Sequence, residues 1–310
     1  MTTALITHPA CLDHDPGAWH PESAERLRAV LSALDVPEFA ALARVEAPGA
    51  TVEQLTRVHP PAYVNGILAI HPEPGQPVHV DGDTVMSDGS AEAASRAAGA
   101  AVKAVDMVFG GEARNAFAAV RPPGHHAEPN RPMGFCLFNN VGIAALHARA
   151  QWGVQRVAVV DFDVHHGNGT QALFENDPDL FYASSHQSPF YPGTGSRAER
   201  GVAGNIVNAP LRAGDGGAAF RAVWEREILP ALGQFNPGLL IISAGFDAHV
   251  DDPLAQLKLE ISDYVWLTEA LLDVAERCCG GRVVSVLEGG YDLDALARSA
   301  AAHVRVLMRA

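Results

Sequence analysis

The sequence is short of cysteine and of basic residues, and each shortage argues against a class of protein. Lysine and arginine number 22 against 36 aspartates and glutamates, a formal net charge of −14, which argues against a nucleic-acid-binding surface. Only four cysteines occur in 310 residues, and they form neither a Cys-x-x-Cys pair nor a convincing disulfide framework. They are Cys11, Cys136, Cys278 and Cys279.

Long apolar runs are also missing. No run reaches the roughly 20 residues that a membrane-spanning helix needs, and the N-terminus lacks the basic start and apolar segment of a signal peptide. With the few cysteines, this predicts a protein of the reducing cytoplasm that does not contact a membrane. The acidic balance is compatible with cationic substrates, although it is common in soluble proteins generally.

Strands and helices alternate along most of the chain, which has 48% hydrophobic residues to build a core. Apolar runs predict strands within residues 1–10 and at 44–47, 115–120, 157–162, 180–185, 205–209, 239–243 and 283–287. Helical spacing predicts helices at 23–34, 51–55, 90–109, 139–151, 217–232, 261–277 and 293–308. This order predicts an α/β protein with a parallel sheet covered by helices on both faces.

The chain shows no internal repeat and no interdomain linker, so we expect one domain over residues 1–310. The 29 glycines and 21 prolines are spread along it, which indicates many tight loops rather than disorder. Residues 59–68 and 71–90 are predicted to form one long connection rich in proline and glycine.

A cluster of polar side chains follows the apolar run at 157–160. Asp161, Asp163 and His165 alternate along the chain, so in extended backbone they leave on the same side. Two carboxylates and an imidazole at a strand end are suitable ligands for a divalent metal ion. The ordinary alternative is a solvated, turn-rich loop.

Polar residues follow three other predicted strands in the same way. In open parallel sheets, ligands bind beyond the carboxyl ends of the strands, so we expect the four strand ends to build one site. The residues concerned are His125 and His126, Asp161 to Asn168, Asp247, and Glu288 and Tyr291.

Residue types suggest roles within such a site. Asp163, His165 and Asp247 would hold a divalent ion with three ligands, which leaves a position open for catalysis. His125 and His126 could move protons, with Asp161 and Asn168 as groups of suitable type to orient them. Tyr291 could donate to an oxyanion, and the glycine pair Gly289-Gly290 before it frees the backbone to present it.

Each residue taken alone also has an ordinary explanation. His125 and His126 could belong to a plain loop after Pro-Pro-Gly, Asp247 could be a turn or cap residue, and Tyr291 a rim aromatic. His249 forms Asp247-x-His249 and could be a further ligand, but we interpret it as part of a solvated loop.

Six motifs resemble those of zinc-dependent histone deacetylases. The resemblance is closest to the class II branch and its bacterial homologues, which include acetylpolyamine amidohydrolases. The motifs span nearly the whole chain in the order of that family: RPPGHHAE (121–128), MGFCLFNNV (133–141), VDFDVHHGNGTQ (160–171), PGTG (192–195), SAGFDAHVDDPL (243–254) and LEGGY (287–291).

The resemblance implies a three-layer arginase/deacetylase α/β fold around a largely parallel eight-stranded sheet. It implies one Zn²⁺ ion bound by Asp163, His165 and Asp247. It implies that His126 is the main general base and acid, that His125, paired with Asp161, assists it, and that Tyr291 polarises the acetyl carbonyl. Asn168 stands where class I members carry aspartate and class II members asparagine. A potassium ion is implied near Asp161, Asp163, His165, Ser184 and Ser185.

The resemblance also assigns substrate-binding residues. Phe135 and Tyr191 would form the walls of the acyl channel, where the family usually has phenylalanine at the second position. Arg26 resembles the arginine of the inner acetate pocket, and Asp83 more weakly resembles a residue that holds the substrate backbone. The remaining substrate-binding residues are Gly134, Leu254 and Gly289.

The implied reaction is hydrolysis of an acylated amine by metal-activated water. Acetyl-lysine of a protein or peptide is the first expected substrate, and acetylpolyamines are the second. Leu254 favours the first, because the polyamine-preferring eukaryotic relative has glutamate at the matching position. A two-manganese ureohydrolase of the arginase type and a non-catalytic acyl-lysine-binding module are less favoured. The sequence is compatible with a monomer and with a homo-oligomer.

Overall fold

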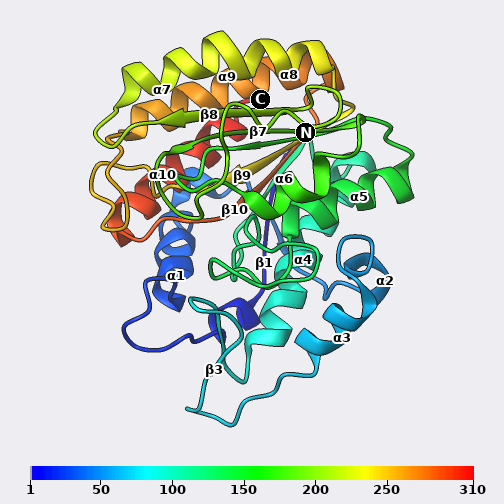
Figure 1. The fold of residues 1–310 in the computed structure, drawn as a ribbon, viewed down its shortest axis with the longest axis vertical. Helices are drawn as coiled ribbons and strands as arrows, with labels where there is room; N and C mark the ends of the chain where they lie inside the picture. The colour runs from blue at the N-terminus through cyan, green and yellow to red at the C-terminus, as the bar shows by residue number, and fades with distance from the viewer. Residues whose placement is uncertain (1) are drawn as a thin grey trace.

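An eight-stranded sheet forms the centre of the molecule, which is a computed structural model describing residues 2–310 (Figure 1). The order of the strands is β2-β1-β5-β10-β9-β6-β7-β8, and every pairing in the sheet is parallel. The prediction of a largely parallel sheet of eight strands is therefore confirmed. The strands are β1 (Thr3–Thr7), β2 (Ala43–Glu46), β5 (Asn115–Ala118), β6 (Val157–Asp161), β7 (Leu180–Gln187), β8 (Ile206–Leu211), β9 (Leu239–Ala244) and β10 (Val283–Leu287).

Helices cover the sheet in two groups and complete three layers. One group contains α4 (Ser90–Phe109), α5 (Asn140–Trp152) and α6 (Asn168–Phe174). The other contains α1 (Ala24–Ala33), α7 (Gly217–Val223), α8 (Leu229–Phe235), α9 (Ile261–Cys279) and α10 (Leu293–Leu307). Figure 1 shows α7, α8 and α9 above β7 and β8, with α5 and α6 below them.

Local sequence signals explain where the elements begin and why they are buried. Thr51 and Gln54 form a capping box at the start of α2 (Val52–Leu55), because each side chain accepts from the backbone N–H of the other residue. All five residues of β6 are buried, as a continuous apolar strand covered on both faces requires.

Two predicted segments differ from the structure. The connection predicted at 59–90 contains helix α3 (Pro61–Leu68) and a short antiparallel hairpin of β3 (Val78–His79) and β4 (Val85–Met86). The prolines that suggested a loop stand at the start of α3, where the missing N–H costs nothing.

The helix predicted at 217–232 is interrupted. A π-helical turn, Trp224–Ile228, separates α7 from α8. Pro230 follows at the start of α8, and because it lacks an N–H it cannot continue an uninterrupted α-helical ladder.

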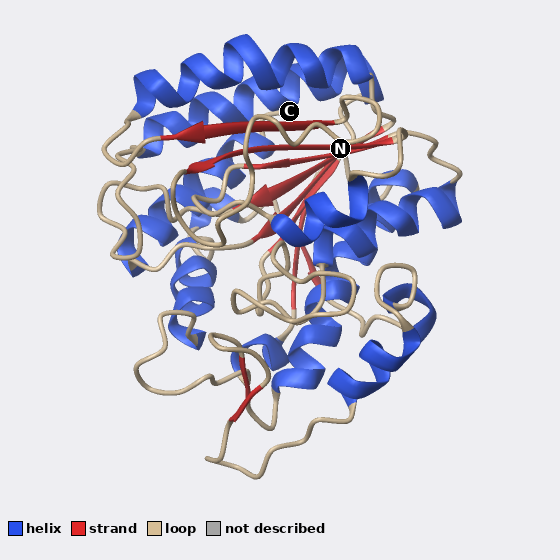
Figure 2. Cartoon of the chain, in the orientation of Figure 1, coloured by secondary structure: helices blue, strands red, loops and turns tan. Residues whose placement is uncertain are grey.

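The four strands that lead into the predicted site lie side by side. They are β5, β10, β9 and β6, the central strands of the sheet. Figure 2 shows the strand arrows pointing to the same side of the molecule, so their polar ends meet there. Among residues 2–310, no helix has both the length and the apolar character needed to cross a membrane.

The packing of α4 yields a test of stability. A Cβ atom on Gly99, buried in α4, would lie 1.9 Å from the carbonyl oxygen of Pro48. Gly99→Ala should therefore lower the free energy of unfolding by about 1–3 kcal/mol, although alanine is the better helix former.

Gly66→Ala in α3 is the matched control, because nothing lies within 4 Å of its Cβ position. It should raise the free energy of unfolding by about 0.5–1 kcal/mol. Denaturant unfolding measures both variants, and changes of the same sign would contradict the role assigned to the close contact.

Candidate metal and catalytic site

Three residues from two strand ends form a group that could hold a metal ion. One ligand atom from each of Asp163, His165 and Asp247 lies within 4.8 Å of the others, and all three residues are buried. Nδ1 of His165 lies 3.1 Å from Oδ1 of Asp163 and 3.1 Å from Oδ2 of Asp247. The structure thus brings together the three predicted ligands and keeps them away from bulk water.

The charges in this group suit a divalent cation. Burial and the neighbouring charge of Asp163 raise the pKa of Asp247 to about 7. Burial alone would lower the pKa of His165, but its contacts with Asp163 and Asp247 raise it to about 10. The two buried carboxylates therefore repel each other, and a cation bound between them would offset their negative charge.

The backbone holds the ligands from close range. The N–H of Val164 donates to Oδ1 of Asp247 at 2.8 Å, and that of Gly289 donates to Oδ2 of Asp163 at 2.8 Å. A Cβ atom on Gly289 would lie 2.2 Å from Oδ2 of Asp247, so only glycine permits this approach. The observed contacts of Gly289, predicted to bind substrate, are thus with the carboxylates of the candidate metal group.

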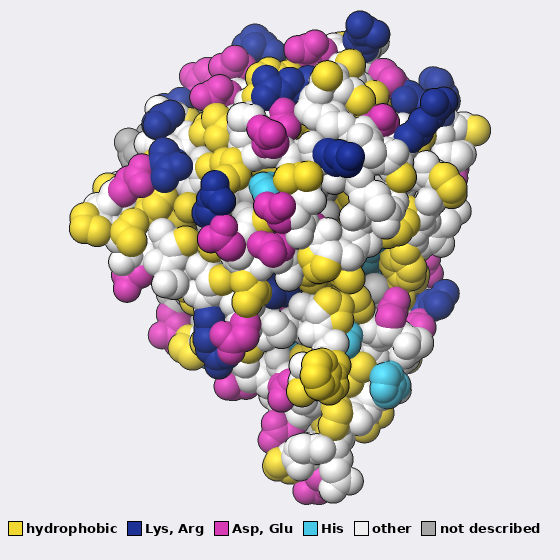
Figure 3. Space-filling view, turned by 90° about the vertical axis from the view of Figure 1, so that its left-hand side faces the viewer, with side chains coloured by type: hydrophobic (Ala, Val, Ile, Leu, Met, Phe, Trp, Pro, Cys, Tyr) yellow, Lys and Arg dark blue, Asp and Glu magenta, His cyan; other side chains and the backbone are white. Residues whose placement is uncertain are grey.

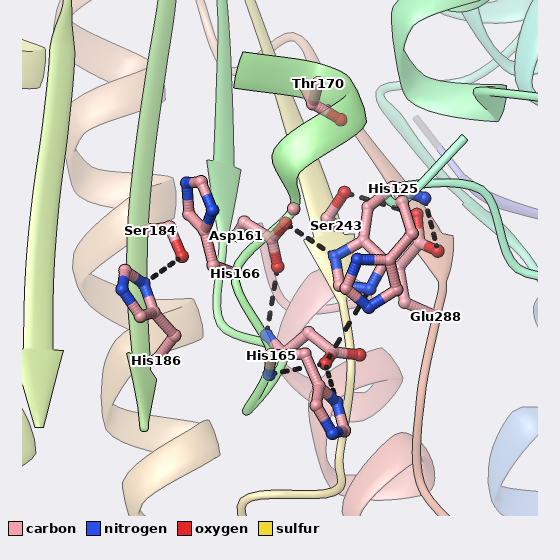
Figure 4. Close-up of polar contacts among 12 residues, drawn as sticks. His125, Asp161, His165, His166, Thr170, Ser184, His186, Ser243 and Glu288 are labelled. Atoms are coloured by element: carbon pink, nitrogen blue, oxygen red, sulfur yellow. Dashed lines mark hydrogen bonds and ion pairs between the residues drawn. The ribbon is translucent and has the colours of Figure 1, made fainter. Parts of the chain in front are cut away.

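The two histidines are oriented by different partners. Nδ1 of His125 contacts Oδ2 of Asp161 at 2.9 Å, and Nδ1 of His126 contacts Oδ1 of Asn168 at 2.8 Å. Figure 4 shows His125 facing Asp161 from beside the end of β6. Both pairings predicted from the sequence are therefore present in the geometry.

These partners give the histidines opposite charge preferences. Burial alone would lower the pKa of His125, but the charges of Asp163 and Asp161 raise it well above its ordinary value. Burial and the charge of His125 lower the pKa of His126 well below its ordinary value. The pair therefore combines a protonated His125 with a neutral His126, which is free to accept a proton.

Three further side chains support this pair and were given no role from the sequence. Glu128 accepts a hydrogen bond from Nδ2 of Asn168 at 2.9 Å, and Tyr182 donates to Oδ2 of Asp161 at 3.1 Å. Glu288 accepts from the backbone N–H of Gly124 and His125 at 2.7 and 3.2 Å. Burial raises the pKa of Glu288 to about 7.

Sequence signals for two of these residues were present. Glu288 is a charged residue directly after the apolar strand β10, and Tyr182 is a tyrosine within the buried strand β7. A buried carboxylate or phenol requires a polar partner, so each position predicts a contact without identifying the partner.

Arg26 lies beneath Tyr291 and is fully buried. Its guanidinium donates to the carbonyl oxygens of Gly290 and Glu288, each at 2.5 Å, and lies 4.9 Å from the centre of the Tyr291 ring. Glu22 accepts from Arg26 at 2.9 Å and also pairs with Arg121, so its carboxylate offsets part of the positive charge of the two buried arginines. Arg26 therefore braces the segment that carries Tyr291.

A pocket of about 110 Å³ leads to His126 and His165. Its lining contains Asp83, Gly134, Phe135, Tyr191, Leu254 and Tyr291, which are six of the residues predicted to meet substrate or its carbonyl. Oδ1 of Asp83 accepts from the backbone N–H of Gly134 at 2.9 Å, which fixes the wall at Phe135. Phe190, not singled out before, stacks on His165 with ring centres 5.3 Å apart.

Figure 3 looks onto the side of the molecule toward which the strand arrows point. Acidic, basic and apolar side chains alternate over this face, without a broad area of one charge. The overall negative charge is thus not gathered on this side of the molecule.

The interpretation of His249 as a solvated residue is wrong. The side chain is buried, and its Nδ1 accepts from the backbone N–H of Asp251 because the loop folds back against Leu259. His166, which had no assigned role, contacts Thr194 at 2.7 Å and Gln171 at 2.8 Å. It therefore anchors the loop that carries Tyr191.

Among the residues predicted to lie near a potassium ion, the two serines turn their hydroxyls to different partners. Asp161 and Ser184 are partners on adjacent strands, and the Ser184 hydroxyl contacts Nδ1 of His186 at 2.9 Å (Figure 4). Ser185 points to the other face of β7, where its hydroxyl accepts from Nε1 of Trp224 at 3.0 Å. The Ser185 hydroxyl is therefore engaged away from Asp161.

Comparisons with known proteins agree on one family. Residues 20–307 match the Histone deacetylase domain. The chain is 43% identical over 280 residues to the histone deacetylase-like amidohydrolase of Pseudomonas aeruginosa, covering 88% of this chain and 73% of that protein. It is 40% identical over 318 residues to the chloroplastic histone deacetylase 14 of Arabidopsis thaliana, covering 96% and 75%. The crystal structure of the HDA15 HD domain aligns with a TM-score of 0.93 at 36% identity, covering 99% of this chain and 88% of that one.

The ligand group predicts a metal stoichiometry. Metal analysis of the purified protein should find about one ion per chain, because three ligands form one site. His165→Ala should lose the ion, whereas His249→Ala, also buried but outside the group, should keep it. Two equivalents of manganese per chain would contradict the single site and favour an arginase-type centre.

Proposed function

This chain belongs to the histone deacetylase family, and from this we propose that it is a zinc-dependent amidohydrolase that removes acetyl or related acyl groups from lysine side chains of proteins or peptides. Its three-layer architecture is the arginase/deacetylase fold. The observation that carries the proposal is the buried group of Asp163, His165 and Asp247 near His126, whose Nδ1 is held by the amide oxygen of Asn168.

His126 is the proposed general base and acid. Oδ1 of Asn168 accepts a hydrogen bond from Nδ1 of His126. Nδ1 of His126 therefore carries the hydrogen, and Nε2 presents a lone pair. When bound, the metal ion would polarise the amide carbonyl and lower the pKa of a water molecule. His126 takes a proton from the attacking water at Nε2 and returns it to the amine nitrogen as the C–N bond breaks; the second proton of the water also ends on the amine, so the products are a carboxylate and an ammonium group.

His125 and Tyr291 stabilise charge in this proposal. The protonated His125, held by Asp161, places positive charge next to His126 and limits how tightly His126 keeps its proton. Burial raises the pKa of Tyr291 well above its ordinary value, so its hydroxyl stays protonated and can donate to the oxyanion. Arg26 stabilises the segment before Tyr291 by donating hydrogen bonds to the carbonyls of Glu288 and Gly290.

The proposed substrate is acyl-lysine, with acetylpolyamines as the second candidate. The narrow pocket between Phe135 and Tyr191 suits an extended alkyl chain, and Asp83 stands at its wall to meet the substrate backbone. Leu254 contributes an apolar surface rather than a charge for a distant ammonium group. Acetylpolyamines are kept as the second candidate substrate because the net charge of −14 would attract a cationic molecule.

The proposal includes three further parts. Residues 1–310 act as one catalytic domain, supported by a site assembled from strands of both halves of the chain. A potassium ion lies near Asp161, Asp163, His165, Ser184 and Ser185, supported by the pairing of Asp161 with Ser184 on adjacent strands. The enzyme works in the cytoplasm, supported by four cysteines that are all free thiols.

The roles of two residues can be tested by substitution. Tyr291→Phe and His126→Ala should each lower kcat on an acetyl-lysine peptide by roughly 10²–10⁴-fold, because each removes a group that acts in the transition state. Metal content should stay at the wild-type value in both.

Tyr63→Phe is the control for the tyrosine, since that hydroxyl contacts the Leu137 carbonyl outside the metal group. It should change kcat less than about threefold. Full activity of either test variant would disprove the assigned mechanism.

A side-by-side kinetic comparison tests the substrate class. We expect a higher kcat/KM for acetyl-lysine peptides than for acetylpolyamines, with longer acyl-lysines measured in the same series. Leu254→Glu should improve the ratio for polyamines by roughly tenfold, because it adds a carboxylate at the rim. Leu254→Gln introduces a side chain of the same shape as glutamate but without its charge, and it should leave this ratio unchanged. A wild-type preference for acetylpolyamines would reverse the assignment.

A further inference from the structure

Asp252 joins two residues that line the pocket from different loops. Its side chain is buried, with 7% exposed. Oδ1 accepts from the backbone N–H of Leu254 at 3.0 Å, and Oδ2 accepts from that of Tyr291 at 2.7 Å. One carboxylate therefore bridges the loop after β9 and the segment after β10.

The contact with Leu254 alone would be an ordinary turn. An aspartate that accepts from the N–H two residues ahead stabilises its own loop. The contact with Tyr291 crosses 39 positions of the chain and has no such local reason. It is also the shorter of the two, at 2.7 Å against 3.0 Å.

Arg26 and Asp163 hold the backbone before Tyr291. Arg26 donates to the carbonyls of Glu288 and Gly290, and Asp163 accepts from the N–H of Gly289. Gly290 has φ of +125°, a conformation in which glycine is unstrained. Tyr291 thus follows a residue whose backbone conformation favours glycine.

The residue after Tyr291 belongs to a rigid element. Asp292 caps α10 by accepting from the backbone N–H of Ala295 at 2.8 Å. Tyr291 therefore lies between a glycine of positive φ and a capped helix, and its own N–H is held by Asp252.

We infer that Asp252 is a positioning residue for the proposed reaction, whose carboxylate sets the Tyr291 hydroxyl against the substrate carbonyl and ties it to the rim at Leu254. It acts through the backbone and touches no reacting atom. The inference rests on the proposed function, because it assigns Tyr291 a catalytic hydroxyl. Misplacing such a group by about 1 Å is enough to slow the reaction strongly.

A double-mutant cycle tests this coupling. Asp252→Asn keeps the shape but turns one acceptor into a donor, so one of the two N–H groups loses its partner. In the metal-loaded enzyme it should lower kcat roughly tenfold or more with KM changed less. In the Tyr291→Phe background the same substitution should lower kcat less than about twofold.

Asp251→Asn is the matched control, since it removes the same charge from a neighbouring side chain that is 65% exposed. It should leave kcat unchanged in both backgrounds. Equal losses from Asp252→Asn in the two backgrounds, or loss of the metal ion, would overturn the inference.

A second measurement does not depend on activity. The chain has five tyrosines, so 3-fluorotyrosine labelling gives a short fluorine spectrum in which Tyr291→Phe identifies the Tyr291 signal. Asp252→Asn should broaden or split that signal in the metal-loaded protein, and Asp251→Asn should leave it unchanged. An unaltered signal in Asp252→Asn would overturn the inference. If wild-type protein hydrolysed no acetylated amine, the proposed function would fail while this spectrum still decided the role of Asp252.

Discussion

The burial of two carboxylates side by side is the constraint on which the site depends. Asp163 and Asp247 both lie near His165, and burial, together with repulsion from Asp163, raises the pKa of Asp247 to about 7. Such a pair persists only where positive charge and N–H donors face it. The N–H groups of Val164 and Gly289 meet this need, and glycine at 289 lets the backbone come close enough.

The adjacent histidines His125 and His126 have different hydrogen-bond partners, and this gives them different charges. A carboxylate, Asp161, faces His125, whereas an amide, Asn168, faces His126. Since the rings lie 4.0 Å apart, protonation of one disfavours protonation of the other. The protein thus keeps a cation and a neutral base next to each other, which suits a proposed reaction that needs both fixed charge and proton transfer.

Most residues of the candidate site could be predicted from the sequence, because they follow strands that are strongly apolar. Asp161 ends β6, Asp163 follows it closely and Asp247 follows β9, and in a parallel sheet the carboxyl ends share one edge. Less could be predicted where proline was ambiguous. Pro61 begins helix α3 although it suggested a loop, because proline is favoured in the first helical turn as well as in turns.

The sequence by itself determined the fold class, the strand ends that carry the site and the chemical types of its ligands, because apolar periodicity and residue type are local properties. Only the tertiary structure decided which distant groups meet. It placed β5, β10, β9 and β6 side by side, brought Asp252 to the backbone of Tyr291 and buried His249, which its sequence neighbours suggested was exposed. Such contacts depend on strand order and loop closure, which no short stretch of sequence specifies.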